Sequence, residues 1–346
     1  MIGHRWSNRL LPLRTAGGRF IVAAAMSAAL CSASCGAILL DDTWADADRT
    51  NTNLPTDSPT YIGQSSDNGS NSVSAGSLDF ALPTNSLKVW EYFTSDNSAP
   101  DGNQPHNAVT QLNVGDMLTA SVSFELPEGA TSASTSKNFR LGLFHDPTDA
   151  RVQADVNSDG GGSGSPWSDA LGYNVQLPLN ATSSGNNPLQ IGKRTALNSS
   201  LLGSSGAYTF APTGGTEYAL AADTVYTVQL MLNVVSASQL DVTASVLQGN
   251  TVLSTHTVSD TGSAFGGNAV SGSLPGNQDV YTNFDQLFWR NSNSTQVAGT
   301  ANDPTHGLLS FTNWRVEHKV IPEPAALALA GLGSAVLVLL HHRRRA

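Results

Sequence analysis

Short runs in which apolar and polar residues alternate, separated by Gly, Asn, Asp and Pro, follow one another through the middle of the chain. Runs with a period of two between turn residues are typical of β-strands. We expect strands at 77–82, 87–93, 117–126, 138–144, 171–179, 188–194, 224–235, 240–248, 251–258, 284–290 and 308–318. The middle has no convincing helical period over ten residues. The pattern therefore predicts an all-β domain, a two-sheet antiparallel jelly-roll-like β-sandwich.

Two of these runs carry more detailed predictions. The dipeptide Gly249-Asn250 separates the runs 240–248 and 251–258, and such a dipeptide favours a two-residue hairpin turn. The run 224–235 has no clean polar side, because Val225 and Met231 share the side of Thr227 and Gln229. That pattern predicts a strand buried on both faces.

The amino end has the layout of a secretory signal. Four arginines and no acid precede an apolar stretch from Phe20 to about Leu40, and Asp41 follows. We expect a signal helix over 1–47 with cleavage after Ala47, or alternatively after Ala37. An uncleaved membrane helix is a further alternative, whereas a lipoprotein site at Cys35 lacks the expected leucine. Both cysteines of the chain lie in this segment, so a mature protein starting after Ala37 contains no disulfide.

The carboxyl end combines an apolar segment with a basic terminus. Residues 325–340 carry no charge, and as a helix they measure about 24 Å, enough to span a membrane if the flanking side chains snorkel. Arg343, Arg344 and Arg345 follow and would stay on the cytoplasmic side. Two prolines before the segment keep the residues around Glu323 extended and outside the helix. A plain tail anchor is the simpler alternative.

The triplet Pro322-Glu323-Pro324, the short apolar segment and the terminal arginines resemble the PEP-CTERM sorting signal. The resemblance covers residues 321–346 and implies a bacterial, exported protein. It implies passage through the Sec translocon, an inner-membrane intermediate held by residues 325–340, and recognition by an exosortase. It also implies a destination at the cell surface or in the extracellular matrix, in the company of exopolysaccharide and biofilm.

The residues between the two ends form one predicted domain. Residues 48–75 are polar and rich in Ser, Asn and Thr, which predicts a loosely ordered leader. Residues 76–320 are then the sandwich. The succession NFRLGLF, LGYNVQLPL, FDQLFWR and FTNWRV resembles the concanavalin A-like jelly rolls of laminin-G-type modules, lectins and some glucanases.

Charge and composition narrow the choice of partners. The formal net charge is −10, and seven of the seventeen basic residues lie at the two ends, so the middle is strongly acidic. Nucleic acids and anionic lipids require positive charge, so the sequence argues against both as partners.

One loop has the pattern of a calcium ligand set. Asp155-Val156-Asn157-Ser158-Asp159-Gly160 places oxygen ligands at alternate positions before a glycine. The bidentate glutamate of a twelve-residue loop is missing, and Asp169 is the nearest substitute. Asp155, Asn157, Asp159 and Asp169 are therefore candidate calcium ligands, and an acidic surface loop without metal is the alternative.

Signs of catalysis are weak. The chain has no pair of strand carboxylates of the glycosidase type, no G-x-S-x-G and no H-E-x-x-H or C-x-x-C pattern. Trp167 and Tyr173 flank the acidic loop and are the candidate glycan-stacking residues. We expect a non-enzymatic surface or matrix protein associated with exopolysaccharide. A lectin-like carbohydrate-binding module with structural calcium and a glycan-degrading enzyme are the alternatives.

Overall fold

A computed structural model describes residues 36–64, 71–80, 87–95, 109–126, 137, 139–145, 151–156, 167–178, 188–198, 200–203, 205–291 and 309–320. Within these residues the secondary structure is almost wholly β, and every pairing between named strands is antiparallel. The predicted signal helix and the predicted carboxyl-terminal helix lie outside the described residues. No helix in the described part of the chain is long and apolar enough to span a membrane.

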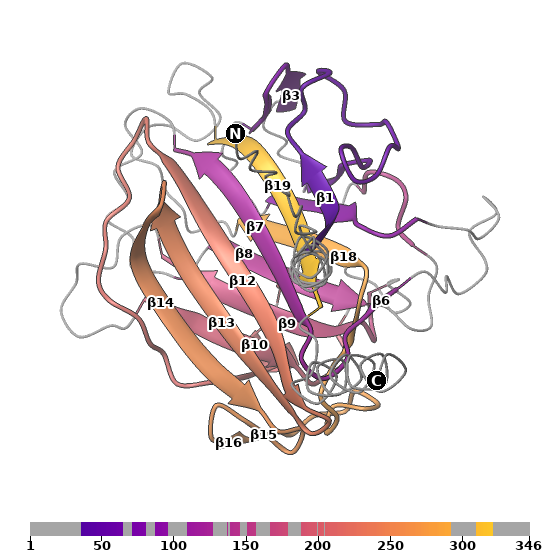
Figure 1. Cartoon of the computed structure of the whole chain (residues 1–346), viewed down its shortest axis with the longest axis vertical. Helices are drawn as coiled ribbons and strands as arrows, with labels where there is room; N and C mark the ends of the chain where they lie inside the picture. The colour runs from indigo at the N-terminus through magenta and orange to yellow at the C-terminus, as the bar shows by residue number, and fades with distance from the viewer. Residues whose placement is uncertain are drawn as a thin grey trace, which may run out of the picture. The chain divides into compact units, whose positions relative to one another are not determined.

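The larger sheet has ten strands and forms one layer of the sandwich (Figure 1). Its order is β16-β15-β14-β13-β12-β7-β19-β4-β3, and β1 also pairs with β19. The strands are β1 (Ala37–Asp42), β3 (Asn71–Ser74), β4 (Ser77–Phe80), β7 (Met117–Glu125), β12 (Val225–Ser236), β13 (Gln239–Gln248), β14 (Thr251–Asp260), β15 (Ala264–Phe265), β16 (Asn268–Ala269) and β19 (Leu309–Lys319).

The smaller sheet has seven strands in the order β11-β10-β9-β8-β18-β5-β2. They are β2 (Tyr61–Gln64), β5 (Leu87–Tyr92), β8 (Phe139–His145), β9 (Leu171–Leu177), β10 (Gln190–Arg194), β11 (Tyr208–Phe210) and β18 (Gln286–Asn291). A separate two-stranded sheet consists of β6 (Thr110–Gln111) and β17 (Asn283–Phe284).

One apolar core fills the space between the two sheets, and a second apolar cluster covers the outer side of the smaller sheet. In β7 the apolar side chains at alternate positions are buried, and the polar ones between them are half-exposed. The inward positions of both sheets are supplied by Leu, Val, Ile, Phe, Tyr and Trp. Such alternation is what a sheet with one buried face requires.

The eleven predicted strands are all present, with their ends shifted by a few residues. The hairpin between β13 and β14 is confirmed, with Gln248 opposite Thr251 and a positive φ of 56° at Gly249. The prediction for 224–235 is wrong. In β12, Tyr226, Val228, Leu230 and the following even positions are buried, while the odd positions between them are half-buried or exposed.

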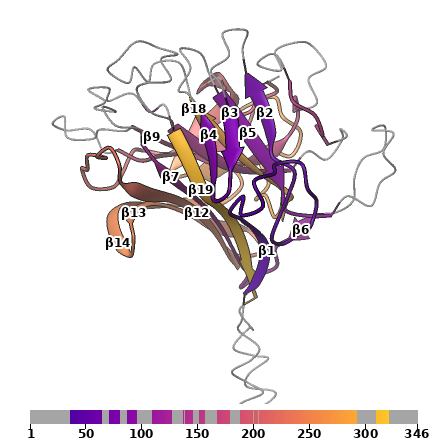
Figure 2. The same cartoon turned by 90° about the horizontal axis from the view of Figure 1, so that it is seen from above.

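The structure places a strand inside the predicted signal segment 1–47, whose boundary stays a prediction. β1 lies within the predicted signal segment, yet it pairs with β19 over Ala37–Asp42 (Figure 2). Leu40 and Trp44 are 0% and 1% exposed and belong to the main core. An apolar run such as AILL suits a buried strand as well as the end of a signal helix. Its pairing partner, β19, lies at the other end of the domain, where a local pattern cannot reveal it. The sandwich therefore begins at β1.

The expectation of a loose leader over 48–75 is likewise wrong for its described residues. β2 and β3 each pair with a strand of the sandwich, and Ser58 and Thr60 are buried. The Ser58 hydroxyl donates to the backbone oxygen of Tyr92 at 2.8 Å, which attaches the segment to β5. Polar residues here form hydrogen bonds with the fold instead of remaining solvated.

A chain that begins at Asp48 should therefore fold poorly. Removing residues 36–47 deletes β1 and the fully buried side chains of Leu40 and Trp44. Loss of one buried Leu and one buried Trp costs several kcal/mol, on the order of a domain's whole stability. We expect low soluble yield and a lowered thermal midpoint relative to a chain starting at Gly36. Amino-terminal sequencing of the exported protein should find its start before β1, and a start at Asp48 would contradict this.

Candidate functional site

Trp167, the predicted glycan-stacking residue, is buried. Its side chain is 2% exposed and packs edge-on against Trp90, with 5.1 Å between ring centroids, and against Phe288 at 5.7 Å. The Arg194 guanidinium donates to the backbone oxygens of Trp167 at 2.6 Å and Ser168 at 3.1 Å, which holds this turn against the sheet. The expectation that Trp167 is exposed is wrong, because its ring completes the second apolar cluster.

We accordingly expect Trp167→Ala to act on stability. Truncating a fully buried Trp in a packed aromatic cluster costs about 3–5 kcal/mol. Chemical denaturation should show an unfolding free energy reduced by that amount, with any glycan association of the folded fraction retained. A variant that lost binding and kept wild-type stability would contradict this placement.

Tyr173 is 0% exposed in the main core, and it joins a buried polar network. Its hydroxyl donates to Asp260 Oδ2 at 2.5 Å and accepts from the backbone nitrogen of Tyr281 at 3.0 Å. Burial, together with the charge of Asp260, raises the pKa of Tyr173 well above its ordinary value. Tyr173 is therefore a fixed donor inside the protein and is closed to a sugar.

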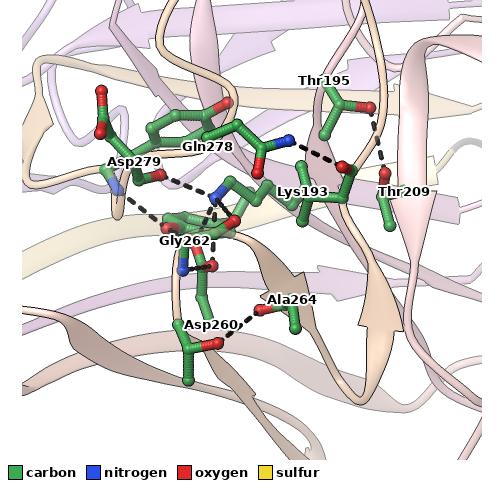
Figure 3. Close-up of polar contacts among 12 residues, drawn as sticks. Lys193, Thr195, Thr209, Asp260, Gly262, Ala264, Gln278 and Asp279 are labelled. Carbon is green, nitrogen blue, oxygen red and sulfur yellow. Dashed lines mark hydrogen bonds and ion pairs between the residues drawn. The ribbon is translucent and has the colours of Figure 1, made fainter.

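The centre of this network is a buried ion pair between the two sheets (Figure 3). Lys193 of β10 and Asp260 of β14 are both 0% exposed, with Nζ 2.9 Å from Oδ2 and 3.0 Å from Oδ1. Lys193 Nζ also donates to the backbone oxygens of Gly262 at 3.3 Å and Asp279 at 2.7 Å. Burial lowers the pKa of Lys193, and Asp260 opposes that effect.

Breaking this pair on one side should be strongly destabilising. Lys193→Met leaves the Asp260 carboxylate buried without its cation, and such single changes typically cost about 3–5 kcal/mol. The double variant Lys193→Met/Asp260→Leu removes both charges and should recover a large part of the loss. Denaturation of the two single variants and the double variant gives the coupling energy, and a value near zero would contradict this role of the pair.

The predicted calcium ligands are only partly described. Asp155 accepts from Arg49 NH2 at 2.6 Å and from the backbone nitrogen of Ile62 at 2.9 Å, so it joins the amino-terminal segment to β2. Asn157 and Asp159 lie outside the described residues, and Asp169 is half-buried. Among the described residues no three His, Cys, Asp or Glu side chains form a metal-holding group. Calcium at the 155–159 loop stays a prediction, with Asp155 engaged by Arg49.

The outer side of the larger sheet carries a regular set of polar side chains. We call it the hydroxyl face and define it by the outward side chains of four adjacent strands, β7, β12, β13 and β14 (Figure 1). Its uncharged polar side chains are Thr119, Ser121, Ser123, Thr227, Gln229, Asn233, Thr243, Ser245, Thr255, Thr257 and Ser259, and all are half-buried or exposed. Met231 is an apolar member of the face, and the half-buried acids Glu125 and Asp241 lie on it near strand ends. Asp241 Oδ1 accepts from the Ser259 hydroxyl at 2.7 Å.

The register places these side chains in rows across the strands. Ser121 lies opposite Gln229, Gln229 opposite Ser245, and Ser245 opposite Thr255. Neighbouring rows are two residues apart along each strand, which gives a spacing of about 4.8 Å across the strands and about 7 Å along them. The result is a regular array of polar groups on a twisted sheet.

Hydroxyl pairs crosslink the array. Ser123 and Thr227 are 2.9 Å apart, Thr243 and Thr257 2.8 Å, and Ser245 and Thr255 3.0 Å. A hydroxyl has one donor and two acceptor lone pairs, so each pair keeps hydrogen-bonding capacity for groups outside. The central rows of the face can bind an uncharged, hydroxyl-rich ligand by many weak hydrogen bonds and without desolvating a charge.

Sequence reasoning found the alternation in 240–248 but did not recognise a surface in it. The signal was the recurrence of Thr and Ser on the polar side of 117–126, 240–248 and 251–258. Those runs form one face only because β7, β12, β13 and β14 are neighbours in the sheet. The predicted sorting residues Pro322, Glu323, Pro324, Arg343, Arg344 and Arg345 lie outside the described residues.

Comparison with solved structures returns lectin-like sandwiches. The lectin I of Ulex europaeus in complex with the methyl glycoside of α-L-fucose is 10% identical, covering 84% of this chain and 100% of that chain, with a TM-score of 0.38. Basic winged bean lectin with Tn-antigen is 11% identical, covering 76% and 93%, with a TM-score of 0.37. The Emp47p carbohydrate recognition domain is 10% identical, covering 82% and 96%, with a TM-score of 0.37.

No curated protein matches the chain. The carboxyl-terminal segment, in contrast, matches the PEP-CTERM protein-sorting motif over residues 320–345. The match begins immediately after β19, whose last residue is Lys319. It implies an exported protein that passes through a membrane and is processed by an exosortase. The matched residues, 320–345, follow the all-β sandwich and do not include it.

Proposed function

We propose that the protein is a non-enzymatic component of the cell surface or extracellular matrix that associates with neutral exopolysaccharide through the hydroxyl face. The observation that carries the proposal is the regularly spaced array of hydroxyl and amide groups on β7, β12, β13 and β14, whose central rows carry no charge. Sorting through an exosortase accounts for how the sandwich reaches such a partner.

The chemistry of the face favours a neutral glycan over a charged one. A neutral polysaccharide offers donors and acceptors of the same kind as the solvent that it replaces, so association rests on many hydrogen bonds of modest net worth. An anionic polysaccharide meets a chain with a net charge of −10 and is repelled at low ionic strength.

The placement of aromatic residues separates this proposal from an ordinary lectin-like pocket. Five tryptophans are described, and all are buried: Trp44, Trp90, Trp167, Trp289 and Trp314. These five side chains are therefore not accessible for stacking on a sugar ring. The hydroxyl face supports weak binding along a polysaccharide chain and does not support tight binding of a single sugar.

The burial of two neighbouring carboxyl groups also supports a non-enzymatic role. Asp42 and Glu91 are neighbouring acids that are 1% and 0% exposed, so both are closed to a substrate. A glycosidase needs both carboxyl groups beside the substrate. Release of reducing ends from a polysaccharide by the purified protein would favour the enzyme alternative.

Affinity electrophoresis through gels that contain a neutral polysaccharide tests the proposal. The protein should be retarded, and Ser245→Arg should reduce the retardation because a bulky charge interrupts the row from Ser121 to Thr255. Loss of one or two hydrogen bonds corresponds to an affinity about five- to thirtyfold lower.

Ser271→Arg is the matched control, since Ser271 is an exposed serine in a loop away from the four strands. It adds the same charge and should leave the retardation unchanged. Equal loss in both variants, or no retardation of the wild-type protein by any neutral polysaccharide, would contradict the proposal. Thermal midpoints of the three proteins verify that folding is intact.

A further inference from the structure

The Lys193–Asp260 pair brings an amine and a carboxyl group together out of reach of solvent. Both side chains are 0% exposed, and the pair joins β10 of the smaller sheet to the end of β14 in the larger sheet. The amine donates to the Asp260 carboxylate and to the backbone oxygens of Gly262 and Asp279 (Figure 3). An amine and a carboxyl group held in contact without water are the two reactants of an amide bond.

The amine lies at reacting distance from the carboxyl carbon. Lys193 Nζ is 2.9 Å from Oδ2 and 3.0 Å from Oδ1 of Asp260. Because the nitrogen is almost equidistant from the two oxygens, its distance to Cγ, the carbon that they share, is on the order of 3 Å. Reacting atoms have about that separation in a near-attack geometry. The fold has therefore already brought the two groups together.

The other contacts of Lys193 set the direction of attack. Nζ donates one hydrogen to the backbone oxygen of Asp279 at 2.7 Å and one to that of Gly262 at 3.3 Å. A lysine ammonium has three hydrogens, so the third faces Asp260. Transfer of that proton to the carboxylate leaves a neutral amine whose lone pair points at the carboxyl group. Burial favours the neutral amine, since it lowers the pKa of Lys193, although the charge of Asp260 opposes this effect.

Two donors prepare the carboxyl oxygens of Asp260 for different roles. The backbone N–H of Gly262 donates to Oδ1 at 2.8 Å, and the Tyr173 hydroxyl donates to Oδ2 at 2.5 Å. Gly262 has a φ of 80°, and a Cβ atom there would lie 2.3 Å from the backbone oxygen of Gln278, so this turn requires glycine. The N–H stabilises negative charge that develops on Oδ1, and the hydroxyl assists the departure of Oδ2.

We propose that Lys193 and Asp260 join spontaneously in an amide bond between Nζ and Cγ, with release of one water molecule. After the first proton has moved from Nζ to Oδ2, the nitrogen lone pair forms the bond to Cγ, and an electron pair of the C=O bond moves onto Oδ1. A second proton then passes from the nitrogen to Oδ2. The Cγ–Oδ2 bond breaks with its electron pair, Oδ2 leaves as water, and the pair on Oδ1 restores the C=O bond. Atoms and charge balance, and no co-reactant is consumed.

The bond supplies a cross-link to a sandwich whose described residues contain no cysteine. Lys193 and Asp260 are 67 residues apart in the sequence. A covalent link across that separation restricts the unfolded chain as a disulfide of the same span does. It also replaces a pair of buried charges, whose removal from water is costly, by a neutral amide. Unlike a disulfide, the link does not depend on the redox state of the compartment.

Mass spectrometry of the full chain, purified in detergent and then denatured, tests the proposal. The wild-type protein should be lighter, by the mass of one water molecule, than the sum of the residues between its own termini. Proteolysis should yield a branched peptide that joins Lys193 to Asp260. Lys193→Met should restore the full mass. Lys319→Met is the matched control, since it removes a half-buried lysine of β19 and should keep the loss of water.

Tyr173→Phe separates the reaction from the fold. The ring remains in the core, but Oδ2 loses its hydroxyl donor, so the lighter species should form about one hundredfold more slowly after synthesis. A time course of intact mass in newly synthesised protein measures this rate. A purely structural hydroxyl would change the thermal midpoint and leave the rate of water loss unaltered. Within one preparation of Tyr173→Phe, the cross-linked molecules should have a thermal midpoint higher than the open ones by on the order of 10 °C.

Two outcomes would overturn the proposal. The first is a wild-type protein of full mass with Lys193 and Asp260 recovered in separate peptides, which would show that the pair remains ionic. This measurement does not require any variant to fold. The second is a loss of water that persists in Lys193→Met, which would place the dehydration elsewhere in the chain.

Discussion

The buried ion pair of Lys193 and Asp260 constrains how the two sheets of the sandwich lie against each other. No disulfide is available to the described part of the chain, whose residues include neither cysteine. Removing two charges from water is favourable only when every donor and acceptor is satisfied. The ammonium group of Lys193 meets that condition with Asp260 and two backbone oxygens. The pair joins β10 of one sheet to the end of β14 in the other, and so orients the strand that forms the margin of the hydroxyl face.

Much of the fold could be predicted from local pattern, because alternation is a direct consequence of one buried face. The eleven strands and the Gly249-Asn250 turn follow from period and turn chemistry alone. β12 was predicted to be buried on both faces because Met231 is apolar, although its position in the strand is an outward one. β1 was missed because AILL extends an apolar run that already fits a signal helix, and only its pairing with β19 reveals a strand.

The candidate sites were harder to predict, since they arise from adjacency across the sheets. The threonines and serines of β7 and β13 are more than one hundred residues apart, and β12 lies between them in the sheet, so their common face depends on strand order. Trp167 was misplaced for the opposite reason. Trp167 follows a glycine-rich run and Pro166, and such a sequence suggests exposure. The outer side of the smaller sheet, however, carries its own apolar cluster, and Trp167 belongs to it.

The pairing of β1 with β19 determines when the sandwich can be finished. These two strands come from opposite ends of the described domain, at Ala37–Asp42 and Leu309–Lys319, and they lie side by side. Contacts of such long sequence separation form late, because the whole intervening chain must be present and its closure entropy overcome. The larger sheet cannot be completed until β19 is present, and the segment that matches the sorting motif follows β19 directly after Lys319. Completion of the sheet and availability of the sorting segment are therefore tied to the same end of the chain.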